Sequence, residues 1–97
     1  YFQNLEDNST LSGGNLDSAN LTNAVLTFAN LTGVTLIDAN LTSANLNGAT
    51  LIGANLIGAT LIGADLTDAT YNEYTIFPDG TNYDITLFDY SDMIHTM

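Results

Sequence analysis

The feature that most constrains this chain is a repeat of five residues. Leucine recurs at every fifth position from Leu11 to Leu66, and Tyr71 and Ile76 continue the same row. A small side chain, usually alanine, stands two residues before almost every one of these leucines. Residues 9–73 hold this period without an insertion, which makes thirteen units of five. A fixed period is the signature of a repeat architecture, in which each unit packs on its neighbours.

A period of five fits neither an α-helix nor a long β-strand. One face of a helix recurs about every 3.6 residues and one face of a strand every 2 residues. Within a unit, however, an inward alanine, an outward asparagine and an inward leucine fit a short extended piece, after which two polar or glycine residues turn the corner. A chain that turns the same way every five residues closes a square after four units. The repeat therefore predicts coils of about twenty residues, stacked about 4.8 Å apart.

The columns formed at a spacing of twenty agree with this prediction. Leu16, Leu36 and Leu56 share one column, and we expect Ile76 to follow them inward. The last position of a unit is often Gly, Asn or Asp, the residue types that tolerate the positive φ of a type II turn. These positions are Gly13, Asn23, Gly33, Asp38, Gly48, Gly53, Gly58, Gly63 and Asp68.

The units "ANLTN", "ANLTG", "ANLTS", "ANLNG", "ANLIG" and "ADLTD" resemble the pentapeptide-repeat family, whose unit is commonly written A-[DN]-L-x-x. The resemblance covers residues 9–73. It implies an all-β fold, a right-handed quadrilateral β-helix, which here would form a solenoid of about three coils. The segment "YNEYTIFPDG", residues 71–80, resembles the way in which cyanobacterial members leave the coil.

Four segments of different character make up the chain. Residues 1–3, "YFQ", resemble the end of a viral protease recognition sequence and are interpreted as an expression-tag remnant. Residues 4–8 form a lead-in, and residues 9–73 form the β-helix. Residues 74–97 break the repeat and are rich in aromatic side chains, so we expect them to cap the last coil, as an open solenoid end requires. This cap could include a short helix within 86–97; a mobile tail is the alternative.

The composition argues against a catalytic or metal-binding role, and against nucleic acid or an anionic membrane as a partner. The 97 residues include 11 acidic ones, no Lys, Arg or Cys, and a single His, for a net charge of −11. Such a chain repels nucleic acid and anionic membranes, and it lacks the run of about 18 apolar residues that a membrane span needs. The acids of the repeats fall in different columns, and His95 has no second His or Cys to share a metal. We therefore predict no catalytic, cofactor-binding or metal-binding residue, and no enzyme.

The outward positions offer one candidate site. The residue after each leucine should point outward and is commonly Thr, but four units carry Ile there. Phe28 should also point outward, in the column of Gly48, over whose missing side chain its ring could lie. Contiguous exposed apolar side chains usually mark a contact. The candidate interaction surface is Phe28, Ile37, Ile52, Ile57 and Ile62; the alternative is that the C-terminal segment folds back over the isoleucines.

These observations predict a non-enzymatic structural or protein-interaction solenoid, with a protein partner or self-association and no direct nucleic-acid binding. The resemblance supplies an alternative, because some pentapeptide-repeat proteins are acidic rods thought to mimic DNA and to protect or inhibit gyrase. The net charge agrees with mimicry, but only four of the eleven acids stand before residue 70 in the repeats. The compartment stays open: cytoplasmic, or periplasmic or thylakoid-lumenal after removal of a signal.

Overall fold

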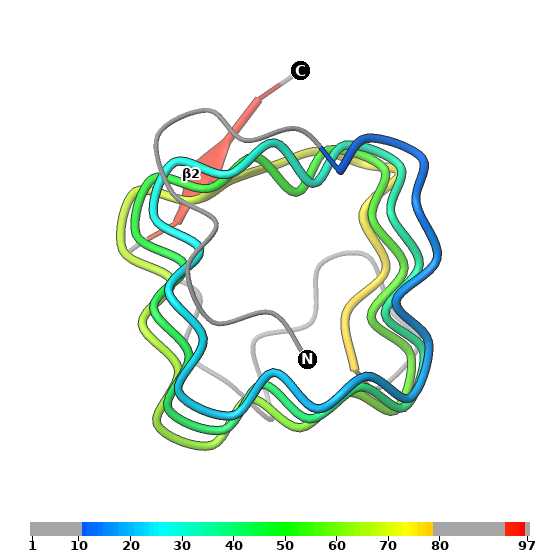
Figure 1. The fold of residues 1–97 in the computed structure, drawn as a ribbon. Helices are drawn as coiled ribbons and strands as arrows, with labels where there is room; N and C mark the ends of the chain where they lie inside the picture. Colours follow the sequence, from blue (N-terminus) through cyan, green and yellow to red (C-terminus); the bar gives the residue numbers. More distant parts are fainter. Residues whose placement is uncertain (1–10, 79–92, 97) are drawn as a thin grey trace.

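The computed structural model describes residues 11–78 and 93–96. Residues 11–78 wind into stacked square coils (Figure 1). Seen from the N-terminal end, the chain runs clockwise as it recedes, so the coil is right-handed (Figure 1). Parallel bridges such as Asn20↔Asn40 and Val25↔Asn45 join residues twenty apart. Four units of five therefore make one turn of the coil, as the sequence predicts.

Backbone hydrogen bonds connect each coil to the next and close each corner. Leu21 N donates to Asn40 O over 2.8 Å, and Asn40 N donates to Ala19 O over 2.9 Å, and this pair of bonds recurs along the walls. At the corner that follows, Ala24 N donates back to Leu21 O over 3.0 Å, and Asn23 takes a φ of 62°. A backbone bond across a two-residue corner with positive φ at the second residue is the pattern of a type II turn.

The outward asparagines also support the corners. The Oδ1 atom of Asn20 accepts the N–H of Thr22 over 3.1 Å, and Asn40 does the same for Thr42 over 3.0 Å. Asparagines of neighbouring coils, such as Asn20 and Asn40, therefore stack on a wall, and their side chains bond to backbone N–H groups.

The interior is built from alternating leucine and alanine. Every leucine from Leu21 to Leu56 is at most 1% exposed, and the alanines between them are equally covered. Thr75 is the one buried polar residue among those the structure describes, and no buried side-chain nitrogen or oxygen of these residues lacks a partner. Such an interior is dry and close-packed, so the walls present mainly their outward residues to other molecules.

The prediction that Ile76 continues the inward row is wrong. The corner at residues 72–74 has three residues where the earlier corners have two, and the bridge Asn55↔Ile76 spans 21 residues instead of twenty. Ile76 therefore lies on the outward side of the wall, beside Asn55. Phe77, which is only 1% exposed, takes the inward place next in the column of Leu56.

Thr75 allows this longer corner to close. It occupies the inward place of an alanine, and its Oγ1 donates to Leu51 O over 2.7 Å and accepts from Asn72 N over 3.1 Å. The Oδ1 atom of Asn72 accepts from Gly53 N over 3.3 Å, so the corner stays tied to the coil before it. The Thr75 hydroxyl and the Asn72 side chain together thus tie the longer corner to the preceding coil.

Two short strands join the C-terminal residues to the last coil. Strand β1, Thr70–Tyr71, pairs in parallel with strand β2, Ile94–His95, in the register Thr70↔Ile94. Ile94 N donates to Ala69 O over 2.8 Å, and Met93 is 8% exposed. Figure 1 shows β2 lying along one wall of the square, where residues 93–96 add a further layer.

Several of the segments predicted from the sequence lie wholly or partly outside the residues that the structure describes. The tag remnant 1–3, the lead-in 4–8 and the segment 79–92 of the expected cap lie outside the described residues. The short helix expected within 86–97 is wrong at its end, because Ile94–His95 is a strand, and the rest of that stretch before residue 93 lies outside the described residues. In the described parts, 11–78 and 93–96, no helix is long and apolar enough to cross a membrane.

Candidate interaction surface

The described residues show no arrangement suited to catalysis or metal binding. Within 11–78 and 93–96, no three His, Cys, Asp or Glu side chains gather where they could hold a metal, and no pocket opens between them. Hydrogen bonds from the Thr67 side chain and backbone lower the pKa of Asp65 below its ordinary value. The Asp65 carboxylate therefore supports the corner that follows it. The His95 ring lies against the Tyr71 ring, with the ring centroids 4.9 Å apart.

Many of the outward residues lie at the four corners of the square. Each corner collects residues twenty apart, because one coil takes twenty residues. The first corner holds residues 12–13, 32–33, 52–53 and 72–74; the second, 17–18, 37–38, 57–58 and 78; the third, 22–23, 42–43 and 62–63; the fourth, 27–28, 47–48 and 67–68.

The five predicted surface residues are divided among all four corners. Ile52 lies at the first corner, Ile37 and Ile57 at the second, Ile62 at the third and Phe28 at the fourth. A single flat partner cannot contact opposite corners of a square rod at once. Of these five, only Ile37 and Ile57 share a column, Ile52 lies at the neighbouring corner, and the five residues do not form one patch.

Ile37 and Ile57 stack at the second corner beside acidic groups. Asp38 N donates to Ile57 O over 2.9 Å, which holds the two layers in register, and Ile57 is 40% exposed. The Oδ1 atom of Asp17 accepts the N–H of Ile37 over 2.9 Å. The carboxylate of Asp38 lies over Gly58, in the space that a side chain there would need. This corner thus combines apolar and negatively charged side chains.

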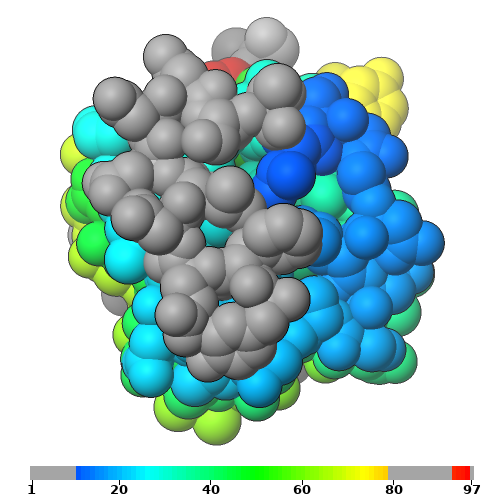
Figure 2. Space-filling view, viewed as in Figure 1, coloured from blue at the N-terminus to red at the C-terminus, as the bar shows by residue number. Residues whose placement is uncertain are grey.

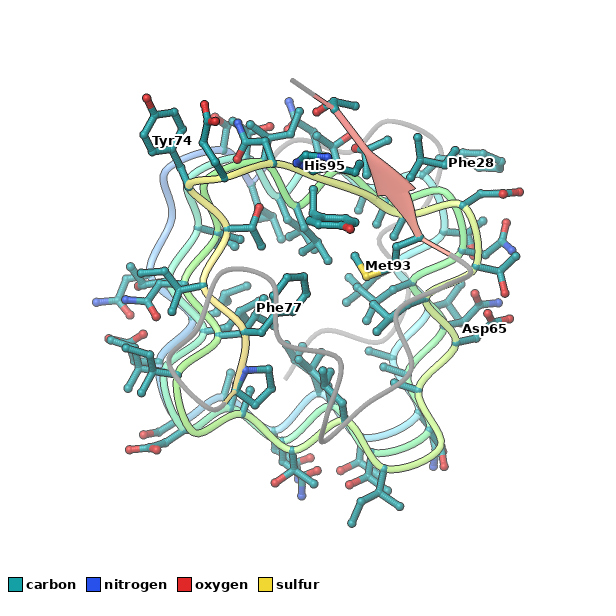
Figure 3. The ribbon with its side chains drawn as sticks, turned by 180° about the vertical axis from the view of Figure 1, so that it is seen from behind. Phe28, Asp65, Tyr74, Phe77, Met93 and His95 are labelled. Carbon is teal, nitrogen blue, oxygen red and sulfur yellow. The ribbon has the colours of Figure 1, made fainter. Side chains whose placement is uncertain are left out.

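Phe28 has an unusual backbone for an aromatic residue. Its φ is 60°, in the left-handed region, and its side chain is 54% exposed. The ring lies against Gly48 of the next coil, where a Cβ would collide with it, as the sequence predicts. Figure 3 shows Phe28 pointing away from the coil. The fourth corner therefore carries one aromatic side chain without apolar neighbours in its column.

Sequence reasoning missed two outward residues, Tyr74 and Ile76. Tyr74 is 70% exposed, and Ile76 is partly exposed beside Asn55. Figure 3 shows Tyr74 pointing outward and Phe77 inward from the same yellow segment, and in Figure 2 this segment projects beyond the blue coils. The sequence signal was the run "YTIF", in which either Ile76 or Phe77 could have faced inward.

Ile76 lies on one wall, which we call the first wall, and Tyr74 lies at the corner that borders it. The first wall consists of residues 14–16, 34–36, 54–56 and 75–77, and it runs from the first corner to the second. Apolar side chains gather at its C-terminal end and at the corners that border it: Ile52, Ile57, Tyr74, Ile76 and Pro78. The other described walls present mainly Asn, Thr and Asp in their outward columns.

Comparison with known proteins agrees with this architecture. The family model described as pentapeptide repeats matches residues 7–36 and 36–70, with eight copies of the repeat. None of the curated proteins compared with the chain matches it.

Two solved structures resemble the chain in both fold and sequence. One is a pentapeptide repeat protein from the thylakoid lumen of Arabidopsis thaliana, with a TM-score of 0.67 and 32% identity over 72% of this chain and 50% of that one. The other is the pentapeptide repeat protein Rfr23 from the cyanobacterium Cyanothece 51142, with a TM-score of 0.72 and 39% identity over 73% of this chain and 48% of that one. The chain spans about half the length of these solved relatives.

Proposed function

Because the chain belongs to the pentapeptide repeat family, we propose that it is a non-enzymatic solenoid that binds a protein partner through its outward surface. Members of the family are generally repeat proteins without enzymatic activity and commonly mediate protein interactions. The rod would comprise about three coils closed by C-terminal residues. Its role would be to present a rigid surface, with no chemistry of its own.

One observation carries this proposal. At the corners, where most units place Thr, Asn, Ser or Asp, the coil carries isoleucines that remain exposed to water: Ile57 is 40% and Ile62 68% exposed. An exposed apolar side chain adds less stability to the coil than a buried one would, but it gives affinity when a partner covers it. A structural spacer would need only the polar corners.

Site-specific photo-cross-linking tests the proposal. A photoreactive residue at position 57 of the full chain, expressed in a cyanobacterium, should give a discrete protein adduct. The same residue at position 20, on a wall of asparagines, is the control and should give none. Absence of an adduct from positions 28, 57, 62 and 74 alike would argue for a purely structural role.

DNA mimicry finds no support in these observations. The described repeat acids, Asp17, Asp38, Asp65 and Asp68, do not follow one line along the rod, since they are divided among two corners and a wall. A gyrase supercoiling assay with the chain added should therefore show no inhibition.

A further inference from the structure

We propose that the first wall binds a protein segment whose apolar side chains are flanked by lysine or arginine. The inference rests on the proposed function, because it names the kind of partner and the wall that receives it. Two independent observations support it: the gathering of apolar side chains at this wall and its corners, and the distribution of charge around them.

The longer corner brings these apolar side chains to adjoining positions of the wall and its corners. The bridge Asn55↔Ile76 places Ile76 in the middle of the wall's last layer. Gly58 N donates to Pro78 O over 2.9 Å, which places Pro78 next to the corner of Ile57. On the other side, Tyr74 projects from the corner that also carries Ile52.

Acidic residues border this wall more than the others. Of the five acids in the described residues, Asp17 and Asp38 stand at the second corner and Glu73 at the first, while Asp65 and Asp68 lie elsewhere. The whole chain contains no Lys or Arg, so no Lys or Arg side chain of its own neutralises these carboxylates. A positively charged partner is attracted to such a border and a negatively charged one is repelled.

Charge also argues against a second copy of the chain as the occupant. Each copy carries a net charge of −11, so two copies that met at this wall would bring like-charged borders together. Such juxtaposition is costly at low salt. Exposed ion pairs alone add little affinity, so the partner needs apolar side chains for affinity and cations for orientation.

A titration of the isotopically labelled full chain, followed by NMR, tests the inference with three synthetic peptides of equal length. One alternates Leu and Lys, one Leu and Glu, and one Ser and Lys. We expect amide shifts from the Leu/Lys peptide to centre on residues 52, 57, 74 and 76. Its affinity should exceed that of the other two peptides by about tenfold or more.

Substitutions provide the matched control. The double variant Ile57→Thr, Tyr74→Ser should bind the Leu/Lys peptide about tenfold more weakly. Ile62→Thr removes the same side chain from the same coil, but at the third corner, where it is 68% exposed; its affinity should stay within about twofold. Thermal unfolding of each variant confirms that it is folded.

Several results would overturn the inference. Equal weakening by Ile62→Thr, or equal binding of the Ser/Lys peptide, would mean that charge alone attracts the peptide to the whole rod. Preferred binding of the Leu/Glu peptide at the same amides would make the charge assignment wrong and leave the proposed function standing. Concentration-dependent dimerisation lost in the double variant would assign the wall to a second copy. No shift with any peptide would also overturn the inference, whereas the proposed function is judged separately by the cross-linking at position 57.

Discussion

The second residue of each two-residue corner adopts a positive φ, and the residues there differ in how well they tolerate it. Glycine has no Cβ and accepts this conformation freely, and Asn and Asp accept it better than other L-residues. Phe28, with a φ of 60°, is the bulkiest exception among the described corners. Its ring, packed on Gly48, offsets part of the backbone cost.

This balance predicts the effect of replacing Phe28. Phe28→Asn loses the ring contact but relieves the backbone, so the free energy of unfolding should change by less than about 1 kcal/mol. Phe28→Ala loses the same ring without that relief and should be less stable than the Asn variant by up to about 1 kcal/mol. Urea denaturation of both variants measures the difference. Equal stability of the two would mean that the positive φ stores no strain.

Asp65 makes the stability of its corner depend on pH. Hydrogen bonds from the Thr67 side chain and backbone hold its pKa below the ordinary value of 3.8 in the folded chain. The carboxylate therefore contributes stability above the unfolded pKa, and this contribution is lost as the pH falls below 3.8 and through the folded pKa. Water screens the exposed group, so the contribution is small.

The variant Asp65→Asn isolates this contribution. Asn45, the preceding residue in the same column, already uses its side-chain oxygen to accept the N–H of Asn47 over 3.0 Å. Asn at position 65 should therefore keep the corner bond but not titrate. Between about pH 7 and pH 3, the free energy of unfolding should fall further for the native chain than for this variant. Parallel pH curves for the two proteins would contradict the assignment.

The structural unit of this fold is the column of residues twenty apart, and the leucines of one column differ in burial from layer to layer. Leu46 lies between other leucines and is fully buried, whereas Leu66 in the same column is partly exposed. Leu46→Ala should cost about 2–5 kcal/mol, because the surrounding coil cannot collapse into the cavity. Leu66→Ala should cost clearly less. Chemical denaturation compares the two, and equal losses would show that the last coil is as tightly packed as the middle one.

Sequence periodicity determines a column only while every corner has the same length. From Leu11 to Tyr71 the period of five correctly predicts the square coil, the inward leucines and the corner conformations. It fails at residues 72–74, because one extra corner residue exchanges the inward and outward sides of the wall that follows. Ile76 and Phe77 are both apolar, so hydropathy could not distinguish the two registers. The hydrogen bond from Thr75 to Leu51 O distinguishes them, and it is visible only in three dimensions.

Thr75 should therefore be essential to the longer corner. Thr75→Val keeps the shape but removes the hydroxyl that donates to Leu51 O and accepts from Asn72 N. Loss of buried hydrogen-bond partners should lower the free energy of unfolding by about 1–3 kcal/mol. Thr75→Ser keeps the hydroxyl and should cost less than the Val variant. If instead Thr75→Ser loses more stability than Thr75→Val, packing of the methyl group and not the hydrogen bonds closes the corner.

At the scale of the whole molecule, the same symmetry that made the fold predictable made the candidate site unpredictable. The period correctly places Ile52, Ile57 and Ile62 after successive leucines, but successive corners of a square point in different directions. A surface arises only where the period breaks, because the residue inserted at the corner brings Tyr74 and Ile76 to the wall between Ile52 and Ile57. The amino-acid composition could not predict this surface, because it does not say which way each side chain points.

The end of the rod gives the last prediction. Residues 93–96 are held on the final coil by two backbone bonds, from Ile94 N to Ala69 O over 2.8 Å and from Thr96 N to Tyr71 O over 2.7 Å, and by burial of Met93. Deletion of residues 93–97 should expose Tyr71 and lower the free energy of unfolding by about 1–3 kcal/mol, measured by urea denaturation. Ile94→Thr, at a position that is 47% exposed, is the control and should change stability little. Because neighbouring coils of a solenoid stabilise one another, unchanged stability after the deletion would mean that β2 does not support the coil beneath it.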